Sequence, residues 1–143
     1  MNIKPILKNL SRRKSMHKLM KTEIDTKQDI KLLVDTFYEK VKIDATIGFF
    51  FTEVVQVNWE NHLPKMYEFW ENIAFSTGNY KGNPIEIHKA IHIQHAMNQY
   101  HFDHWLRIFL NTIDELFEGD KAAFIKERAT SISTFMKIKI VYN

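Results

Sequence analysis

The most informative stretch of the chain is Tyr80-Lys81-Gly82-Asn83-Pro84-Ile85-Glu86-Ile87-His88. The residues up to Gly82 are typical of a loop. Asn83 is a suitable N-cap and proline is favoured at the first position of a helix, so the pattern predicts a short helix that starts at Pro84. That helix would present His88. A neutral imidazole held in this way can bind a metal ion.

The composition indicates one helical domain. The chain has 143 residues, of which 45% are hydrophobic, and this suits a single domain with a sizeable core. Eleven Phe against only four Gly and three Pro favour helices over a turn-rich β protein. The absence of cysteine excludes disulfides, thiolate metal ligands and thioether-linked cofactors.

The excess positive charge is concentrated before the expected core. We interpret residues 1–22 as a basic N-terminal extension and residues 23–143 as the folded domain. The extension places four apolar residues at helical spacing, Ile3, Ile6, Leu7 and Leu10. We expect it to dock on the domain or to fray; membrane contact is the less favoured alternative, and no nucleic-acid partner is expected. No apolar run suits a spanning helix or a secretory signal, which indicates a cytoplasmic protein.

Hydrophobic periodicity predicts helices along the rest of the chain, and the expected fold class is all-α. After a cap at Asp25 or Thr26, an apolar stripe follows the helical rule over Ile30, Leu33, Val34, Phe37 and Val41. A short helical turn is expected over residues 45–51. A long helix is expected from about residue 58 to 75, although Pro64 would move its start towards residue 61 unless it marks a kink.

Two more helices are expected towards the C-terminus. The first runs from residue 100 or 102 to 117 and is closed by Gly119. The second covers residues 121–139, with an inward face of Phe124, Ile125, Ala129, Ile132, Phe135 and Met136. Only residues 138–142 have a β-like pattern.

The long helix and two aromatic residues elsewhere could complete a haem pocket around His88. Such a pocket needs an axial ligand, an apolar slot, cations at its edge and polar donors only where a bound gas sits. One face of the long helix carries His62, Met66, Phe69 and Ile73, with Trp70 beside it. Lys65 supplies a cation. Taken singly, these residues are better explained as core or surface residues.

Tyr38 and Trp105 are candidate hydrogen-bond donors to a bound ligand. A donor to a charged group contributes roughly 1.5 to 3 kcal/mol, which slows ligand loss by about ten- to a hundredfold. Two such donors would make a slow oxygen releaser, suited to redox chemistry or ligand retention. Alternatively, each side chain bonds a nearby backbone carbonyl.

The motifs, in their order and spacing, resemble a group III truncated haemoglobin of bacterial type. The resemblance covers residues 28–137 and rests on Phe37-Tyr38-Glu39-Lys40-Val41, Trp59 with His62, Phe69-Trp70, Tyr80-x-Gly82-x-Pro84 with His88, and Trp105-Leu106 with Phe109. It implies a shortened two-over-two globin fold, non-covalent haem b and His88 as the proximal iron ligand. It likewise implies a distal pocket of Tyr38, His62, Met66 and Trp105. The residues expected to contact the cofactor are Phe37, Lys65, Phe69, Trp70 and Tyr80.

The chain departs from this pattern after His88. The stretch before Trp105 is expected to be long, and it contains His92, His95, His101 and His104. If the helix continued, His88, His92 and His95 would share a face and could hold zinc or another divalent metal instead of haem.

The expected function is reversible binding of dioxygen, or of NO or CO, at a histidine-ligated haem. NO dioxygenase or peroxidase-type turnover is a further hypothesis and would need an external reductase. Enzyme status stays open, because no general base is visible. One rival is a haem-dependent sensor or interaction module that acts through the basic N-terminus. The other is a helical non-haem metal protein that uses the histidines from His88 to His104.

Overall fold

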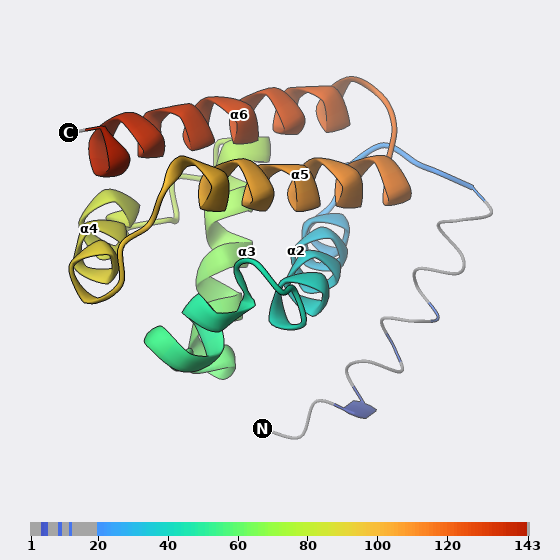
Figure 1. Ribbon diagram of the computed structural model, residues 1–143. Helices are drawn as coiled ribbons and strands as arrows, with labels where there is room; N and C mark the ends of the chain where they lie inside the picture. The colour runs from blue at the N-terminus through green and yellow to red at the C-terminus, as the bar shows by residue number, and fades with distance from the viewer. Residues whose placement is uncertain (1–3, 6–8, 10–11, 13–19, 143) are drawn as a thin grey trace.

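The computed structural model describes residues 20–142, together with residues 4, 5, 9 and 12 (Figure 1). Expectations for the remaining residues of the N-terminal extension, including its apolar stripe, lie outside the described residues. The helices are α2 (Lys27–Lys42), α3 (Trp59–Phe75), α4 (Pro84–Gln94), α5 (Gln99–Leu116) and α6 (Asp120–Met136). Two π-helical turns also occur between residues 20 and 142, η1 (Phe50–Val54) and η2 (Lys137–Val141).

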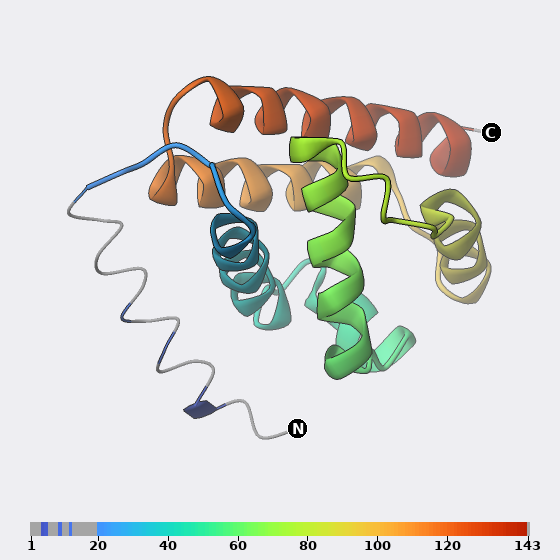
Figure 2. The same cartoon turned by 180° about the vertical axis from the view of Figure 1, so that it is seen from behind.

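The helices form two layers. Figures 1 and 2 show α5 and α6 side by side, with α2 and α3 beneath them. Helix α4 lies at one end of the sandwich, near the start of α5. No β-strand occurs between residues 20 and 142; the one β-type contact there is an isolated bridge between Thr22 and Phe117. The all-α, two-over-two prediction is therefore confirmed.

The helix starts follow from local capping chemistry. Thr26 caps α2, and the Asp29 side chain accepts the Thr26 N–H in return. Asn83 caps α4, and Pro84 occupies its first turn, where a missing N–H costs nothing. These two starts agree with the predictions. The start of α5 comes slightly earlier than expected, because Asn98 closes a capping box with His101.

Some local predictions were only partly right. Helix α3 begins at Trp59, within one residue of the expected start; Pro64 lies inside the helix, and the alternative start near residue 61 does not occur. The helical turn predicted over 45–51 starts at residue 48 and continues beyond the expected end, as η1. The β-like stretch 138–142 forms η2 and its cap.

The inward face predicted for the last helix was also partly wrong. Phe124 and Phe135 are exposed, and cationic side chains lie over their rings. The buried face of α6 instead consists of smaller side chains around Ile125 and Ala129. Small residues let α6 pack closely on α5, so the bulky rings remain outside.

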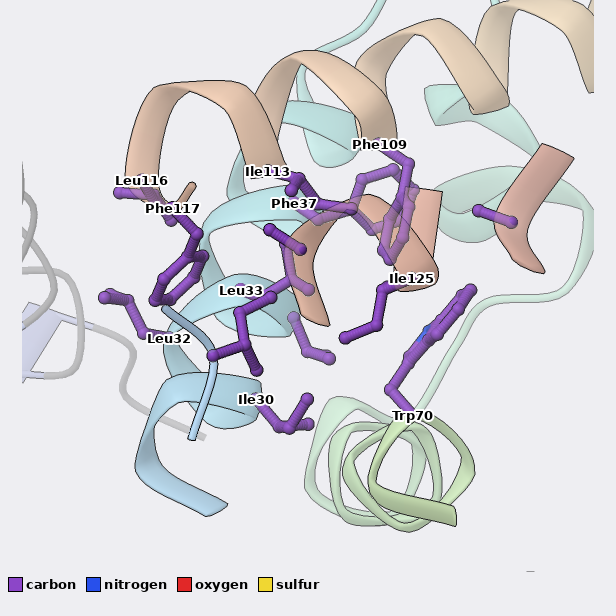
Figure 3. Packing of buried hydrophobic residues seen from close by; sticks show 14 of the residues in the cluster. Ile30, Leu32, Leu33, Phe37, Trp70, Phe109, Ile113, Leu116, Phe117 and Ile125 are labelled. Atoms are coloured by element: carbon purple, nitrogen blue, oxygen red, sulfur yellow. The ribbon is translucent and has the colours of Figure 1, made fainter. Parts of the chain in front are cut away.

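The main core lies between α2, α5 and α6 and is bordered by α3. Figure 3 shows Phe37 and Leu33 of α2 meeting Phe109 and Ile113 of α5, with Trp70 of α3 nearby. These side chains are almost fully buried, and burying each one contributes roughly 1.5 to 3 kcal/mol. None of the described helices is both long enough and apolar enough to cross a membrane.

Candidate functional site

A cavity of about 600 Å³ opens beside the core, and its lining is mainly apolar. This volume falls within the usual range of small-molecule and cofactor sites. Helix α3 contributes more of the wall than any other helix, α4, α5 and α6 contribute smaller parts, and the segment from Ile47 to Val57 closes one side. The lining includes nine of the ten residues proposed from the sequence: Tyr38, His62, Lys65, Met66, Phe69, Trp70, Tyr80, His88 and Trp105.

His88 reaches the cavity from α4. Its Nδ1 lies 2.6 Å from the Pro84 carbonyl oxygen, one turn earlier on the same helix. A carbonyl can only accept, so Nδ1 carries the proton and Nε2 keeps its lone pair. Burial lowers the pKa of His88, and the Pro84 carbonyl partly offsets this. The ring is therefore a neutral imidazole with a single nitrogen available to a metal, and its orientation is set by the backbone.

Tyr38 and His62 form a polar pair in the cavity wall. The phenol oxygen lies 3.2 Å from His62 Nε2, which joins α2 to α3. The Tyr38 ring is buried and packs edge-on against Phe51 and Trp59. Burial raises the pKa of Tyr38, so its hydroxyl stays protonated and can donate.

Burial lowers the pKa of His62 to about 4, and the Lys65 ammonium and the nearby His88 ring add to this effect. The imidazole is therefore neutral at neutral pH. Because both His62 and His88 line the cavity and each is neutral, the site holds two uncharged ring nitrogens in a mainly apolar space.

Aromatic rings form a second wall. Trp105 stacks on Phe109 with ring centroids 5.4 Å apart and nearly parallel planes, and Trp70 stacks on Trp105 at 6.4 Å. Phe69 meets Tyr80 edge-on at 5.0 Å. The Tyr80 hydroxyl packs directly onto Gly82, where a side chain would collide with it. The wall suits a flat, apolar ligand.

Phe37 differs from its expected position. It is almost fully buried and lies behind the wall, edge-on to Tyr38, Trp105 and Phe109. It does not line the cavity, because its place in the apolar stripe of α2 turns it into the core. Phe37 therefore supports the two candidate donors from behind and makes no contact with the cavity itself.

Sequence reasoning missed much of the lining. The part formed before α3 contains Ile47, Phe50, Phe51, Val55 and Val57, and a second group contains Ile91, Met97, His101, Phe102, Ile132, Ser133 and Met136. The run of apolar residues from Ile47 to Phe51 was a usable signal, since such a cluster must be covered. The second group carries no local signal, because those residues meet only when α4, α5 and α6 come together.

The other histidines do not gather around a metal. His92 and His101 accept backbone N–H groups at Nδ1, and His104 Nε2 lies 2.7 Å from an Asp44 carboxylate oxygen. Within residues 20–142, no three His, Asp or Glu side chains come together in a metal-binding group. The alternative of a non-haem site built from this histidine cluster therefore lacks support from the geometry.

The residues fit a haem. The cavity offers one free imidazole nitrogen on His88, a polar pair at Tyr38 and His62, stacked aromatic rings, and the lysines Lys65 and Lys81 in the lining. A porphyrin needs a ligand, an apolar slot and cations for its carboxylates, and each of these is present.

Comparison with known proteins agrees with this geometry. The chain is 27% identical over 118 residues to the group 3 truncated hemoglobin ctb of Campylobacter jejuni subsp. jejuni, covering 80% of this chain and 91% of that protein. The crystal structure of a group III truncated hemoglobin from Campylobacter jejuni matches with a TM-score of 0.76 and 26% identity, over 85% of this chain and 95% of the other. The family model for bacterial-like globins matches residues 22–141. The chain therefore belongs to the bacterial-like globin family.

Proposed function

We propose that this globin binds haem b without a covalent link, with His88 as the proximal iron ligand, and takes a diatomic gas on the side of Tyr38 and His62. Dioxygen is the first candidate, and NO and CO fit the same space. The observation that carries the proposal is the bond from His88 Nδ1 to the Pro84 carbonyl, which leaves Nε2 as the free nitrogen of a cavity residue. Family membership supports a haem cofactor.

Bound haem would supply an iron coordination position at which a gas can bind reversibly. The protein's own residues would orient the iron ligand, line the slot and supply hydrogen-bond donors. Pro84 orients the His88 ring, and the stacked Trp70 and Trp105 keep water out of the slot. Lys65 and Lys81 stand in the lining, where they would meet the porphyrin carboxylates. Tyr38 and Trp105 would donate hydrogen bonds to a ligand that gains negative charge.

Redox turnover would extend this binding function. Oxidation of NO by dioxygen to nitrate takes up one electron from outside and no proton, whereas reduction of peroxide to two water molecules takes up two electrons and two protons. Tyr38 supplies an O–H in the cavity wall, hydrogen-bonded to a neutral His62, and could donate a hydrogen bond in either reaction. An external reductase would supply the electrons. Only the binding step follows from the geometry of the site, so we propose ligand binding as the primary function.

The proposal is tested by absorption spectra of the purified protein, before and after reduction with dithionite. We expect a haem spectrum that changes on adding CO. His88→Gly should lose most of the haem, and added imidazole should restore it, because free imidazole can occupy the space of the missing ring. His104→Gln is the matched control, since His104 bonds Asp44 and is absent from the cavity lining. A colourless protein that does not take up added haemin, or a His88→Gly variant with an unchanged spectrum, would overturn the proposal.

A further inference from the structure

Four histidines beyond His88 take no part in the proposed function, and they differ in their hydrogen-bonding roles. His95 Nδ1 lies 3.3 Å from the Ala96 carbonyl oxygen, and His104 Nε2 lies 2.7 Å from a carboxylate oxygen of Asp44. Carbonyl and carboxylate oxygens can only accept, so both rings donate. Protonation leaves these two bonds intact.

His92 and His101 have the opposite role. The Met97 N–H donates to His92 Nδ1 at 2.8 Å, and the Asn98 N–H donates to His101 Nδ1 at 3.1 Å. A backbone N–H can only donate, so each Nδ1 must keep its lone pair and each ring must carry its proton on Nε2. A second proton at Nδ1 would turn the acceptor into a donor, and the bond to the backbone would be lost.

These two bonds hold the connection between α4 and α5, residues 95–98. His92 stands in the last turn of α4, and His101 closes the capping box at the start of α5. Met97 and His101 both line the cavity. One corner of the cavity wall therefore depends on two neutral imidazoles. Glutamate or glutamine usually takes the place of His101 in a capping box, and neither changes its role near neutral pH.

The surroundings of His101 oppose its protonation. Burial lowers the pKa of His101, and positive charge on His95 lowers it further. Phe49 and Phe50 pack on the His101 ring, with centroids 6.2 Å and 4.9 Å away. Charged groups on the elements around this corner pair with one another: Lys89 with Glu86 on α4, Lys137 of η2 with Asp103 of α5, and His104 with Asp44.

We propose that His92 and His101 form an acid-sensitive latch on the cavity wall. Each holds a backbone N–H of the connection 95–98 only while its imidazole is neutral, so this corner loosens in mildly acidic solution and the cavity releases its occupant faster. The occupant is haem if the proposed function holds. The latch itself depends only on the two histidines and the two N–H groups.

Amide hydrogen exchange tests the latch directly. Exchange rates of the Met97 and Asn98 amides are measured by NMR at about pH 7.5 and about pH 5 and divided by the intrinsic rate at each pH. Once the two rings take up a second proton, the protection of both amides should fall by up to about tenfold per pH unit. The Glu118 amide is the internal control, because it donates to the Thr22 carbonyl, which does not titrate. If the protection of the Met97 and Asn98 amides falls no more between the two pH values than that of the Glu118 amide, the proposal is overturned.

Replacing His92 and His101 with side chains that do not titrate distinguishes the latch from a general loss of stability in acid. In the double variant His92→Asn, His101→Gln, an amide oxygen replaces each Nδ1, so protection of both amides should persist at about pH 5. The single variant His104→Gln should stay as acid-sensitive as the wild type, since the His104 ring is a donor. If the double variant loses protection as the wild type does, the latch is wrong.

Haem release gives the second readout and rests on the proposed function. Transfer of haem to a scavenger protein at about pH 5 should be several-fold slower from the double variant than from the wild type. Equal rates would show that His88 alone governs acid release and would overturn the effect on the occupant. A protein that binds no haem would refute the proposed function, while the amide measurement would still decide on the latch.

Discussion

Tyr38 Oη and His62 Nε2 lie 3.2 Å apart, and this contact joins α2 to α3 in the cavity wall. The His62 tautomer decides what the phenol can do. If Nε2 carries the proton, His62 donates to Tyr38 and leaves the phenol O–H free to donate into the cavity. If Nδ1 carries the proton instead, Nε2 accepts the hydrogen bond from the phenol O–H. In one tautomer the phenol O–H can therefore donate to a ligand, and in the other it donates to His62.

Replacing Tyr38 tests its role as a donor. Tyr38→Phe should raise the dioxygen dissociation rate by about ten- to a hundredfold, because one hydrogen bond to a charged ligand contributes roughly 1.5 to 3 kcal/mol. Stopped-flow kinetics on the haem-loaded protein measures the rate. Tyr100→Phe is the matched control, since Tyr100 is exposed and should have no effect. An unchanged rate in Tyr38→Phe would mean that the phenol stays bonded to His62 when the ligand is present.

His62 should make the fold sensitive to acid. Its pKa falls from 6.5 to about 4 through burial and through the proximity of Lys65 and His88, so the folded state binds fewer protons than the unfolded state. Stability is then complete above about pH 6.5 and declines as pH falls towards about 4. After a discount for partial exposure, the loss is about 2 kcal/mol.

Urea unfolding at several pH values measures this loss in the wild type and in His62→Leu. Leucine has no proton to bind, so the acid-dependent loss of unfolding free energy should be smaller by that amount in the variant. Identical pH profiles for the two proteins would place the acid sensitivity elsewhere.

Two buried threonines should respond in opposite ways to the same substitution. Thr36 Oγ1 has no hydrogen-bond partner in the described part of the chain, whereas Thr112 Oγ1 accepts from Lys40 Nζ and donates to the Ile108 carbonyl. Thr36→Val should therefore raise the unfolding free energy by about 1 kcal/mol, because a buried hydroxyl without a partner is costly. Thr112→Val should lower it by about 1 to 3 kcal/mol. Chemical denaturation measures both, and equal signs would contradict the assignment.

Asp44 should stabilise the segment that closes one side of the cavity. Burial alone would raise its pKa, but hydrogen bonds from His104 and from the Ile47 and Thr46 N–H groups outweigh this and lower it. The stabilisation is present above the unfolded pKa of about 3.9 and is lost as pH falls through the lower folded value. Asp44→Asn should lower the unfolding free energy by about 1 to 2 kcal/mol at neutral pH.

The difference in unfolding free energy between the wild type and Asp44→Asn should become smaller below about pH 4, where the wild-type carboxylate takes up its proton. Thermal or urea unfolding at both pH values measures it. Asp114→Asn provides the control, because Asp114 pairs with Lys126 on the surface and its side chain is 58% exposed. A loss from Asp44→Asn no larger than the loss from Asp114→Asn would show that the bonds of Asp44 contribute little.

The sequence was most informative where the signal is local. Thr26 and Asn83 start their helices as capping chemistry predicts, because a cap involves only a few consecutive residues. The sequence was less reliable in predicting which side chains of a helix face the core. Phe124 and Ile125 are neighbours on α6, and periodicity placed both inward; only Ile125 is buried. Which side of a stripe faces the core depends on how closely the partner helix approaches, and that distance is not encoded in the spacing of one helix.

The sequence by itself determined the helical class, the capped helix that carries His88 and the set of residues able to serve a haem, since each of these rests on the chemistry of neighbouring residues. Only the tertiary structure decided which of them face the same space. It brought Tyr38 within 3.2 Å of His62, and gave His92 and His101 their roles as acceptors. The physical reason is that a hydrogen bond between helices, or a place in a cavity wall, depends on how separate helices cross, and crossing is set by packing of the whole core.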